Sequence, residues 1–159
     1  MNHRTRRRPA PRVAALGIIV VACLLALAPA GWAEDDGAAD GARRATRAFA
    51  EALTRGDASG LRPLLPERGK IQLHLERLGP EEGFFSAGQV EALFSDFLSQ
   101  GAVRAFDLVR VEPDANGLAL VHGKAVIIDR QGRSARIDLH LAFEPEDSRW
   151  VLRELREAP

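Results

Sequence analysis

The sequence GFFSAGQVEALFSDFLSQGAVRAFDLVRVE, residues 83–112, decides the fold because its hydrophobic period changes at Gly101. Before that glycine, Ser86 and Gln89 have the spacing of a helix capping box, in which the two residues satisfy free backbone N–H groups of the first turn. Five large apolar side chains then recur at helical spacing and form one stripe: Val90, Leu93, Phe94, Phe97 and Leu98. The first half therefore predicts a helix that packs on a hydrophobic core.

After Gly101 the apolar residues alternate with a period of two, which is typical of half-buried strands. Four such segments follow one another, at residues 103–112, 118–129, 133–144 and 148–155. The connections between them, PDANG, RQG and PEDS, have the composition of tight turns. Short connections between successive strands predict an antiparallel meander.

The residues before this stretch predict two helical segments and one strand. Apolar residues recur at helical spacing from about Asp40 to Arg55, and Gly56 follows as a stop. A short helical turn is expected over residues 57–69. Residues 70–76, KIQLHLE, alternate between apolar and polar and predict a strand with His74 on its solvent-exposed face. The whole pattern predicts a single α+β domain over residues 42–157, with helices on one face of a curved sheet.

Residues 1–33 have the three parts of a secretory signal peptide: five arginines, an apolar stretch from Val13 to Ala28, and the small-residue end APAGWA. We expect cleavage after Ala33, with Ala30 as the alternative, and a periplasmic or secreted product. The apolar stretch is short for a membrane span, which needs about 20 residues. Cys23 follows IVVA as in a lipoprotein signal, and lipidation would tether the protein to a membrane; the apolar LLALA after it argues against this.

Removal of this leader leaves a mildly acidic chain without cysteine. The leader holds five of the 22 basic residues and no acidic residue, so 17 basic and 22 acidic residues remain, a net charge of −5. The acidic, small-residue segment 34–41 predicts a disordered spacer. No basic stripe indicates a nucleic-acid partner, and no motif in the sequence indicates a metal or any other cofactor.

Six segments carry, in this order, a likeness to a known family: ALTRGDASGLRPLL (52–65), GFFSAGQVEALFSDFL (83–98), AFDLVRV (105–111), HGKA (122–125), RQGRSARIDLHL (130–141) and WVLREL (150–155). They resemble the nuclear transport factor 2-like (cystatin-like cone) superfamily, and most of all a bacterial family of exported proteins called domain of unknown function 4783. The resemblance implies a cone of two to three helices on a curved, mostly antiparallel sheet, often with a pocket. It implies no activity. That family usually has an aliphatic residue where this chain has His122, so no family site transfers to this histidine.

His122 and Lys124 interrupt the apolar strand ALVHGKAVIID, residues 119–129, and the face on which they lie depends on the turns on both sides. If both turns hold an even number of residues, His122 lies beside Asp107 inside the cone. Lys124 is then the next residue along the same strand on that face, and Glu154 lies two strands away. Such a cluster could bind a ligand or move a proton. An odd turn on either side would put these groups in water, and the apolar neighbours of Asp107 favour that alternative.

Three functions remain open on the sequence. The leading hypothesis is an exported, non-catalytic module that binds a small apolar ligand or a protein partner, including a second copy through the outer sheet face. The second is an isomerase- or dehydratase-like enzyme with Asp107 and His122 as its acid/base pair, and the third is an envelope accessory protein without a pocket. On the even register the outer face is small and apolar: Ala119, Val121, Gly123, Ala125, Ile127 and Ala142.

Overall fold

The structure is a computed structural model, and it describes residues 33–78, 81–99, 103–114, 116–128 and 132–158. The predicted signal peptide, apart from Ala33, lies outside these residues. The elements follow in the order α1 (Ala33–Arg55), the 3-10 helix η1 (Ala58–Leu64), β1 (Ile71–Leu75), β2 (Glu81–Phe85), α2 (Ala87–Leu98), β3 (Val103–Pro113), β4 (Ala119–Ile128), β5 (Ser134–Glu146) and β6 (Arg149–Glu157). In the described part of the chain, no helix is both long and apolar enough to cross a membrane.

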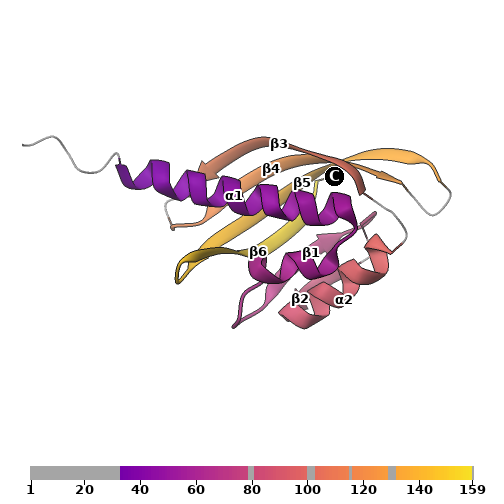
Figure 1. The fold of residues 1–159 in the computed structure, drawn as a ribbon, viewed down its shortest axis with the longest axis horizontal. Coiled ribbons are helices and arrows are strands. Elements are labelled where there is room, and N and C mark those ends of the chain that lie inside the picture. The colour runs from indigo at the N-terminus through magenta and orange to yellow at the C-terminus, as the bar shows by residue number, and fades with distance from the viewer. Residues whose placement is uncertain (1–32, 79–80, 100–102, 115, 129–131, 159) are drawn as a thin grey trace, which may run out of the picture. The chain divides into compact units, whose positions relative to one another are not determined.

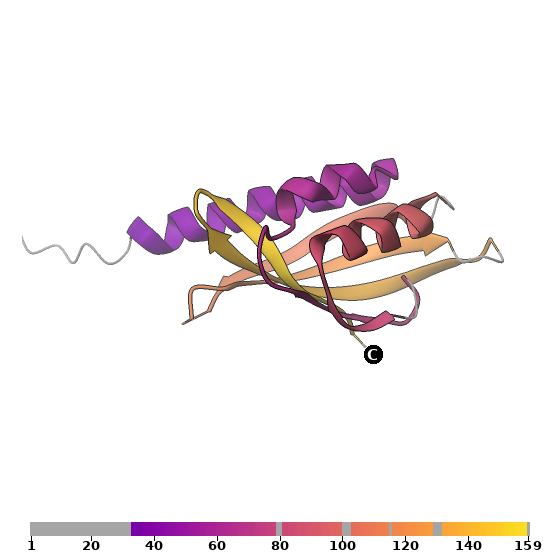
Figure 2. The same ribbon diagram turned by 90° about the horizontal axis from the view of Figure 1, so that it is seen from below.

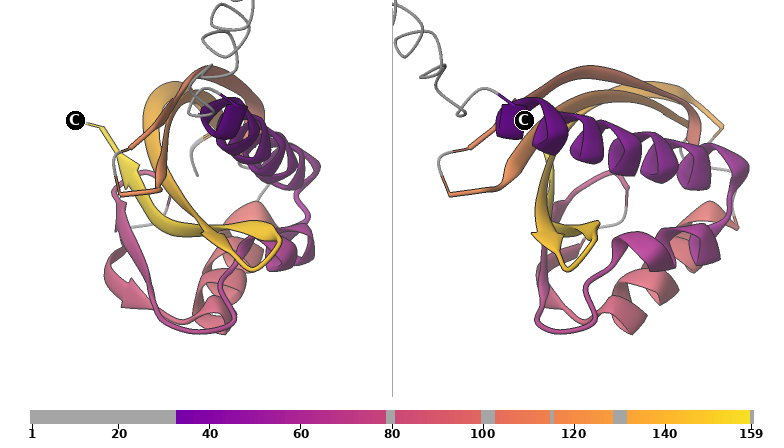
Figure 3. Two further views of the ribbon diagram at one scale, coloured as in Figure 1. Left: turned by 90° about the vertical axis from the view of Figure 1, so that its left-hand side faces the viewer. Right: turned by 60° about the vertical axis from the view of Figure 1, so that its left-hand side comes forward.

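The six strands form one sheet in the order β2-β1-β6-β5-β4-β3 (Figure 1). All neighbouring strands are antiparallel except β1 and β6, which are parallel. Figure 2 shows α1 and α2 on the same side of this sheet, and Figure 3 shows the sheet curving around them. We call the helix-covered side the inner face and the opposite side the outer face. The predicted α+β cone with a C-terminal four-strand meander is confirmed.

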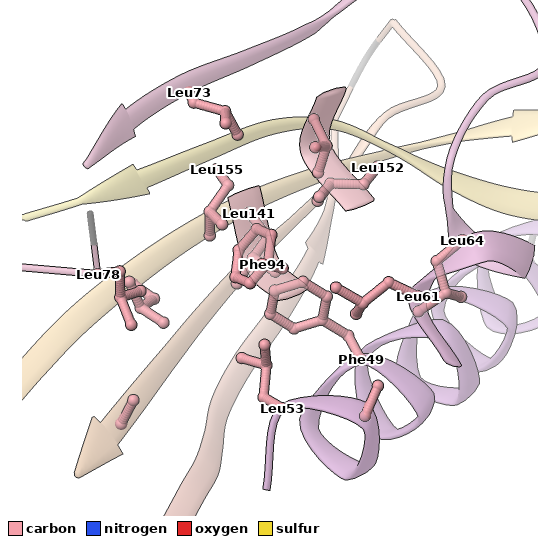
Figure 4. Packing of buried hydrophobic residues seen from close by; sticks show 14 of the residues in the cluster. Phe49, Leu53, Leu61, Leu64, Leu73, Leu78, Phe94, Leu141, Leu152 and Leu155 are labelled. Atoms are coloured by element: carbon pink, nitrogen blue, oxygen red, sulfur yellow. The ribbon is translucent and has the colours of Figure 1, made fainter. Parts of the chain in front are cut away.

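The core lies between the helices and the inner face of the sheet (Figure 4). The ring of Phe49 in α1 packs edge-to-face against Phe94 of α2, with 6.3 Å between centroids, and against Phe106 of β3, with 6.1 Å. Of the predicted stripe on α2, Val90, Phe94 and Leu98 are buried, and Leu93 and Phe97 are partly buried against them. Phe49 therefore connects both long helices and the sheet.

The N-terminus of α2 is capped through the residue pair that the sequence indicates. The side-chain Oε1 of Gln89 accepts hydrogen bonds from the backbone N–H and from the hydroxyl of Ser86, both at 2.9 Å. The carbonyl of Ser86 accepts the first helical bond, from the N–H of Val90 at 3.0 Å. This local signal fixed the start of the helix correctly.

The first helix is longer than predicted. It begins at Ala33, so residues 34–41 are helical and the predicted disordered spacer is wrong. This segment holds two alanines but also two glycines and three aspartates, so helix propensity alone does not account for the helix. Gly41 also lies against the indole of Trp150 in β6, so closely that a Cβ there would be 2.2 Å from Nε1. The sequence could not show this contact because it joins residues more than 100 positions apart.

Strand β2 was not predicted. Its sequence, EEGFF, lacks the apolar alternation of a half-buried strand, and Phe84 is 67% exposed. Pairing with β1 defines this strand, from Ile71 opposite Phe85 to Leu75 opposite Glu81. Gly83 has a φ of 143°, a conformation that other residues rarely adopt. The β1–β2 hairpin therefore extends the sheet beyond β6.

Candidate binding site on the outer face

Both loops beside β4 hold an odd number of residues, which decides between the two predicted registers. Pro113 pairs with Ala119, and Ile128 pairs with Ser134, so five residues lie in each loop. Gly117, the fourth residue of the first loop, has a φ of 81°, a left-handed conformation that glycine adopts readily. The even register is therefore wrong. Every side chain of β4 lies on the opposite face of the sheet from the face that the even register predicts.

The predicted pairing of Asp107 with His122 is also wrong. Asp107 is exposed and pairs with Lys124, while His122 pairs with Arg110. A bulge between Leu108 and Arg110 shifts the register by one residue, which the turn arithmetic could not foresee. Both candidate residues lie on the outer face, but each has a different cross-strand neighbour.

The apolar surface that the even register places outside is mostly inside. Five of its six residues are buried on the inner side of β4: Ala119, Val121, Gly123, Ala125 and Ile127. Ala142 alone of the six is on the outer face, opposite Leu120. The outer face is therefore polar, and its chemistry comes from the residues that alternate with these.

Two adjacent rows of side chains cross the outer face at right angles to the strands. The first, which we call the basic row, runs across β3, β4, β5 and β6: Arg110, His122, His140 and Arg156. The second, which we call the acidic row, runs across the same strands: Glu112, Leu120, Ala142 and Glu154. Along each of the four strands the two rows are two residues apart, which is about 7 Å.

The centre of the basic row is a pair of stacked histidines. The rings of His122 and His140 are 4.9 Å apart between centroids and only 14° from parallel. The Nε2–H of His122 donates to the Oδ1 of Asp138 at 2.8 Å, and the ammonium of Lys124 is 3.8 Å from the same oxygen. The hydrogen bond from His122 holds the pKa of Asp138 below its ordinary value, and Lys124 adds to this effect. Asp138, and not Asp107, is thus the carboxylate that orients His122.

The ends of the two rows are joined by ion pairs within single strands. Arg156 contacts Glu154 on β6, with 2.7 Å between the guanidinium nitrogen and the carboxylate oxygen. Arg110 pairs in the same way with Glu112 on β3. These pairs are half exposed, so they contribute little to the stability of the domain, but they hold two guanidinium groups at the ends of the histidine pair.

An open groove of about 590 Å³ lies over these two rows. Its lining includes all eight residues of the basic and acidic rows, together with Val121, Leu141 and Ala158. Of the predicted ligand-binding residues, His122 and Glu154 line the groove and Lys124 does not; Asp107 is also outside it. The sequence missed Arg110, His140 and Arg156 as site residues, although the odd-turn alternative would have aligned His122 with His140.

The interior of the cone holds no comparable polar cluster among the described residues. Thr46 is the buried polar side chain there, and its hydroxyl donates to the carbonyl of Ala42 at 2.8 Å. Within the same described ranges, no three histidine, cysteine, aspartate or glutamate side chains are placed to hold a metal ion. Among the described residues, the ionisable cluster that lines a groove therefore lies on the outer face.

No family model and no curated protein matches the chain, but solved structures do. It is similar to a candidate dehydratase of the nuclear transport factor 2-like family from Streptomyces avermitilis (TM-score 0.60, 18% identity, 78% of this chain and 96% of that one). It is also similar to a nuclear transport factor 2-like protein of unknown function from Shewanella oneidensis MR-1 (TM-score 0.59, 17% identity, 76% and 98%). A Bacteroides fragilis protein of the domain of unknown function 4783 family gives a TM-score of 0.54 at 14% identity (69% and 93%). The chain therefore has the nuclear transport factor 2-like fold that its sequence resembles.

Proposed function

We propose that this chain is an exported, non-catalytic module that binds a small amphipathic organic anion in the groove on the outer face of its sheet. The observation that carries this proposal is the groove itself. Its volume of about 590 Å³ falls in the range of small-molecule sites, about 300–1,000 Å³. Basic and apolar side chains converge on it from four strands.

The basic row supplies the anion-binding groups. A guanidinium has five N–H donors in a planar fork, so the ion pairs of Arg110 and Arg156 with their glutamates leave donors for a ligand carboxylate or sulfonate. The stacked imidazoles of His122 and His140 lie between the two arginines. Together these groups provide a strip of donors across four strands.

The two central residues of the acidic row, Leu120 and Ala142, supply the apolar floor of the groove. Leu120 is 46% exposed, although it is a large apolar residue, and its cross-strand neighbour is Ala142. Ala142 is only 6% exposed, so an apolar ligand body lying here would remove from water mainly the hydrocarbon surface of Leu120. Glu112 and Glu154 border this floor and would oppose a ligand whose body carries a further negative charge.

The enzyme hypothesis with Asp107 and His122 as its acid/base pair gains no support from the geometry. An isomerase or dehydratase needs an acid/base pair within reach of one substrate atom. Asp107 and His122 pair with different residues, and the described interior of the cone has no ionisable cluster. The likeness to a candidate dehydratase concerns the fold, which by itself does not assign a function. An accessory role without a pocket leaves the groove unexplained.

Binding of 1-anilinonaphthalene-8-sulfonate, an aromatic anion of the proposed kind, tests this function. We expect saturable fluorescence enhancement with residues 34–159, and an affinity about tenfold lower in Arg156→Gln, because the variant loses a charge-assisted hydrogen bond. The matched control is Arg136→Gln, which removes an exposed arginine of β5 outside the groove and should bind like wild type. Equal affinities of wild type and Arg156→Gln would refute the groove as the binding site.

Export is a separate part of the proposal and has its own test. If the leader is cleaved after Ala33, the protein recovered from its native source has Glu34 as its first residue. Intact-mass measurement with N-terminal sequencing would show this terminus. Recovery of the full chain with residues 1–33 attached would contradict export by a cleaved signal, and a lipid-modified Cys23 would show membrane tethering instead.

A further inference from the structure

The basic row ends in two arginines that have the same kind of partner. Arg110 on β3 and Arg156 on β6 each form an ion pair with a glutamate two residues away on the same strand. The two arginines lie three strand positions apart, with His122 and His140 between them. Because neighbouring strands lie about 4.8 Å apart, the backbones of the two arginines are about 14 Å apart along the row.

A ligand with one anionic group uses only one of these arginines. The side chain of Arg156 is 52% exposed, and that of Arg110 is 67% exposed. β6 is paired on both sides, with β1 and β5, whereas β3 is an edge strand of the described sheet. A charge-assisted hydrogen bond is stronger where less water competes for it. Arg156 is therefore the better anchor for a single carboxylate or sulfonate, which leaves the free donors of Arg110 unused.

The floor between the two arginines fits a flat, uncharged body. Ala142, the smallest side chain of the acidic row, lies between Leu120 and Glu154. The groove also reaches Val121 and Leu141, whose side chains are buried on the inner side, so their backbone lines it. The stacked imidazoles border this floor along the basic row. A body that lies here crosses β4 and β5, and its two ends point towards β3 and β6.

We propose that the ligand of the groove is an elongated dicarboxylate, with one carboxylate on Arg156, the other on Arg110 and an uncharged body between them. This inference rests on the proposed anion binding and names the class of anion. A guanidinium that donates to one glutamate still has free N–H groups, so each arginine binds a carboxylate without losing its ion pair. A short dianion would have to draw both side chains away from their glutamates.

Three rigid aromatic acids test this class of ligand. Biphenyl-4,4′-dicarboxylate has a carboxylate at each end of two rings, biphenyl-4-carboxylate has only one carboxylate, and terephthalate has two on a single ring. By isothermal titration calorimetry with residues 34–159, the biphenyl dicarboxylate should bind about tenfold more tightly than the monocarboxylate, because it gains a second charge-assisted contact. Terephthalate should bind no more tightly than the monocarboxylate, since its carboxylates are too close together for both arginines.

Arg110→Gln separates the roles of the two arginines. This variant should lower the affinity for the biphenyl dicarboxylate about tenfold and leave the affinity for the monocarboxylate within about twofold of wild type. Arg156→Gln should lower both affinities about tenfold. The matched control is Arg104→Gln, which removes an exposed arginine of the same strand outside the groove and should bind both acids like wild type.

Glu112→Gln tests the same contact in the opposite direction, which a loss of folding cannot imitate. The change removes the carboxylate that is paired with Arg110, so the guanidinium binds a ligand carboxylate without this competitor. The affinity for the biphenyl dicarboxylate should rise about threefold, and the affinity for the monocarboxylate should not change. An unchanged or lower affinity for the dicarboxylate would contradict a carboxylate site at Arg110, even if Arg110→Gln fails to unfold cooperatively.

The possible results distinguish this inference from the proposed function. Equal affinities of wild type for the two biphenyl acids, or an equal loss of both in Arg110→Gln, would overturn the second contact. Binding of 1-anilinonaphthalene-8-sulfonate through Arg156 would still stand. If neither biphenyl acid binds to wild type, the proposed class of ligand is wrong. If the sulfonate does not bind either, the proposed function is wrong as well.

Discussion

The Phe49→Ala variant should lose about 3–5 kcal/mol of unfolding free energy, the range for removal of a large buried aromatic side chain. Phe49 is 1% exposed and packs edge-to-face on both Phe94 and Phe106. The change therefore leaves a cavity where α1, α2 and β3 meet. Equilibrium urea unfolding, followed by circular dichroism, measures the loss as a lower midpoint.

Phe84→Ala is the matched control for this prediction. Phe84 is the same residue type on β2 but is 67% exposed, so its removal should change the unfolding free energy by no more than about 0.5 kcal/mol. If Phe49→Ala were as stable as Phe84→Ala, the packing of α1 and α2 on the inner face would be wrong. The comparison thus tests which face of the sheet the helices cover.

The Gly123→Ala variant should lose about 1–3 kcal/mol, although it adds a single methyl group to a strand. The ring of Phe106 lies directly over Gly123, and a Cβ at this position would be 2.4 Å from the ring Cζ. The ring would have to move, and it also packs edge-to-face against Phe49. An aromatic ring that covers a strand glycine is a known device for stabilising curved sheets.

Two further variants separate this contact from a general effect of replacing glycine. Gly88→Ala, in the first turn of α2, has open space around the new Cβ and should gain about 0.4–1 kcal/mol. In Phe106→Ala the clash partner is gone, so adding Gly123→Ala to it should cost clearly less than in wild type. Strict additivity of the two changes would contradict the close contact of ring and backbone.

The parts of the fold that were predictable rest on local signals. The capping pair Ser86 and Gln89, the apolar stripe of α2 and the change of period after Gly101 each act within a few residues, and the structure contains all three. β2 lacked such a signal because its pairing with β1, not its own alternation, makes it a strand. The first turns of α1 were assigned wrongly because their sequence, with three aspartates and two glycines, does not favour a helix. The contact of Gly41 with the distant Trp150 cannot be inferred from local sequence.

The site was less predictable because the face on which a strand residue lies depends on whether the preceding turn holds an odd or an even number of residues. One residue more or less in a turn moves His122 from the interior to the outer face, and the sequence of the turn did not fix that number. The bulge next to Arg110 changed the parity along β3 once more. His122 and Glu154 do share one face, but it is the outer face and not the predicted interior of the cone. The structure adds Arg110, His140 and Arg156 to them.

The most direct test of the central claim, that binding occurs on the outer face of the sheet, is an amide chemical-shift map. A titration of ¹⁵N-labelled protein with 1-anilinonaphthalene-8-sulfonate should shift the amides of the two rows, above all those of His122, His140 and Arg156. The amides of Phe49 and Phe94, in the core between helices and sheet, should stay in place. Shifts concentrated at Phe49 and Phe94, with the rows unchanged, would place the ligand inside the cone and contradict the account.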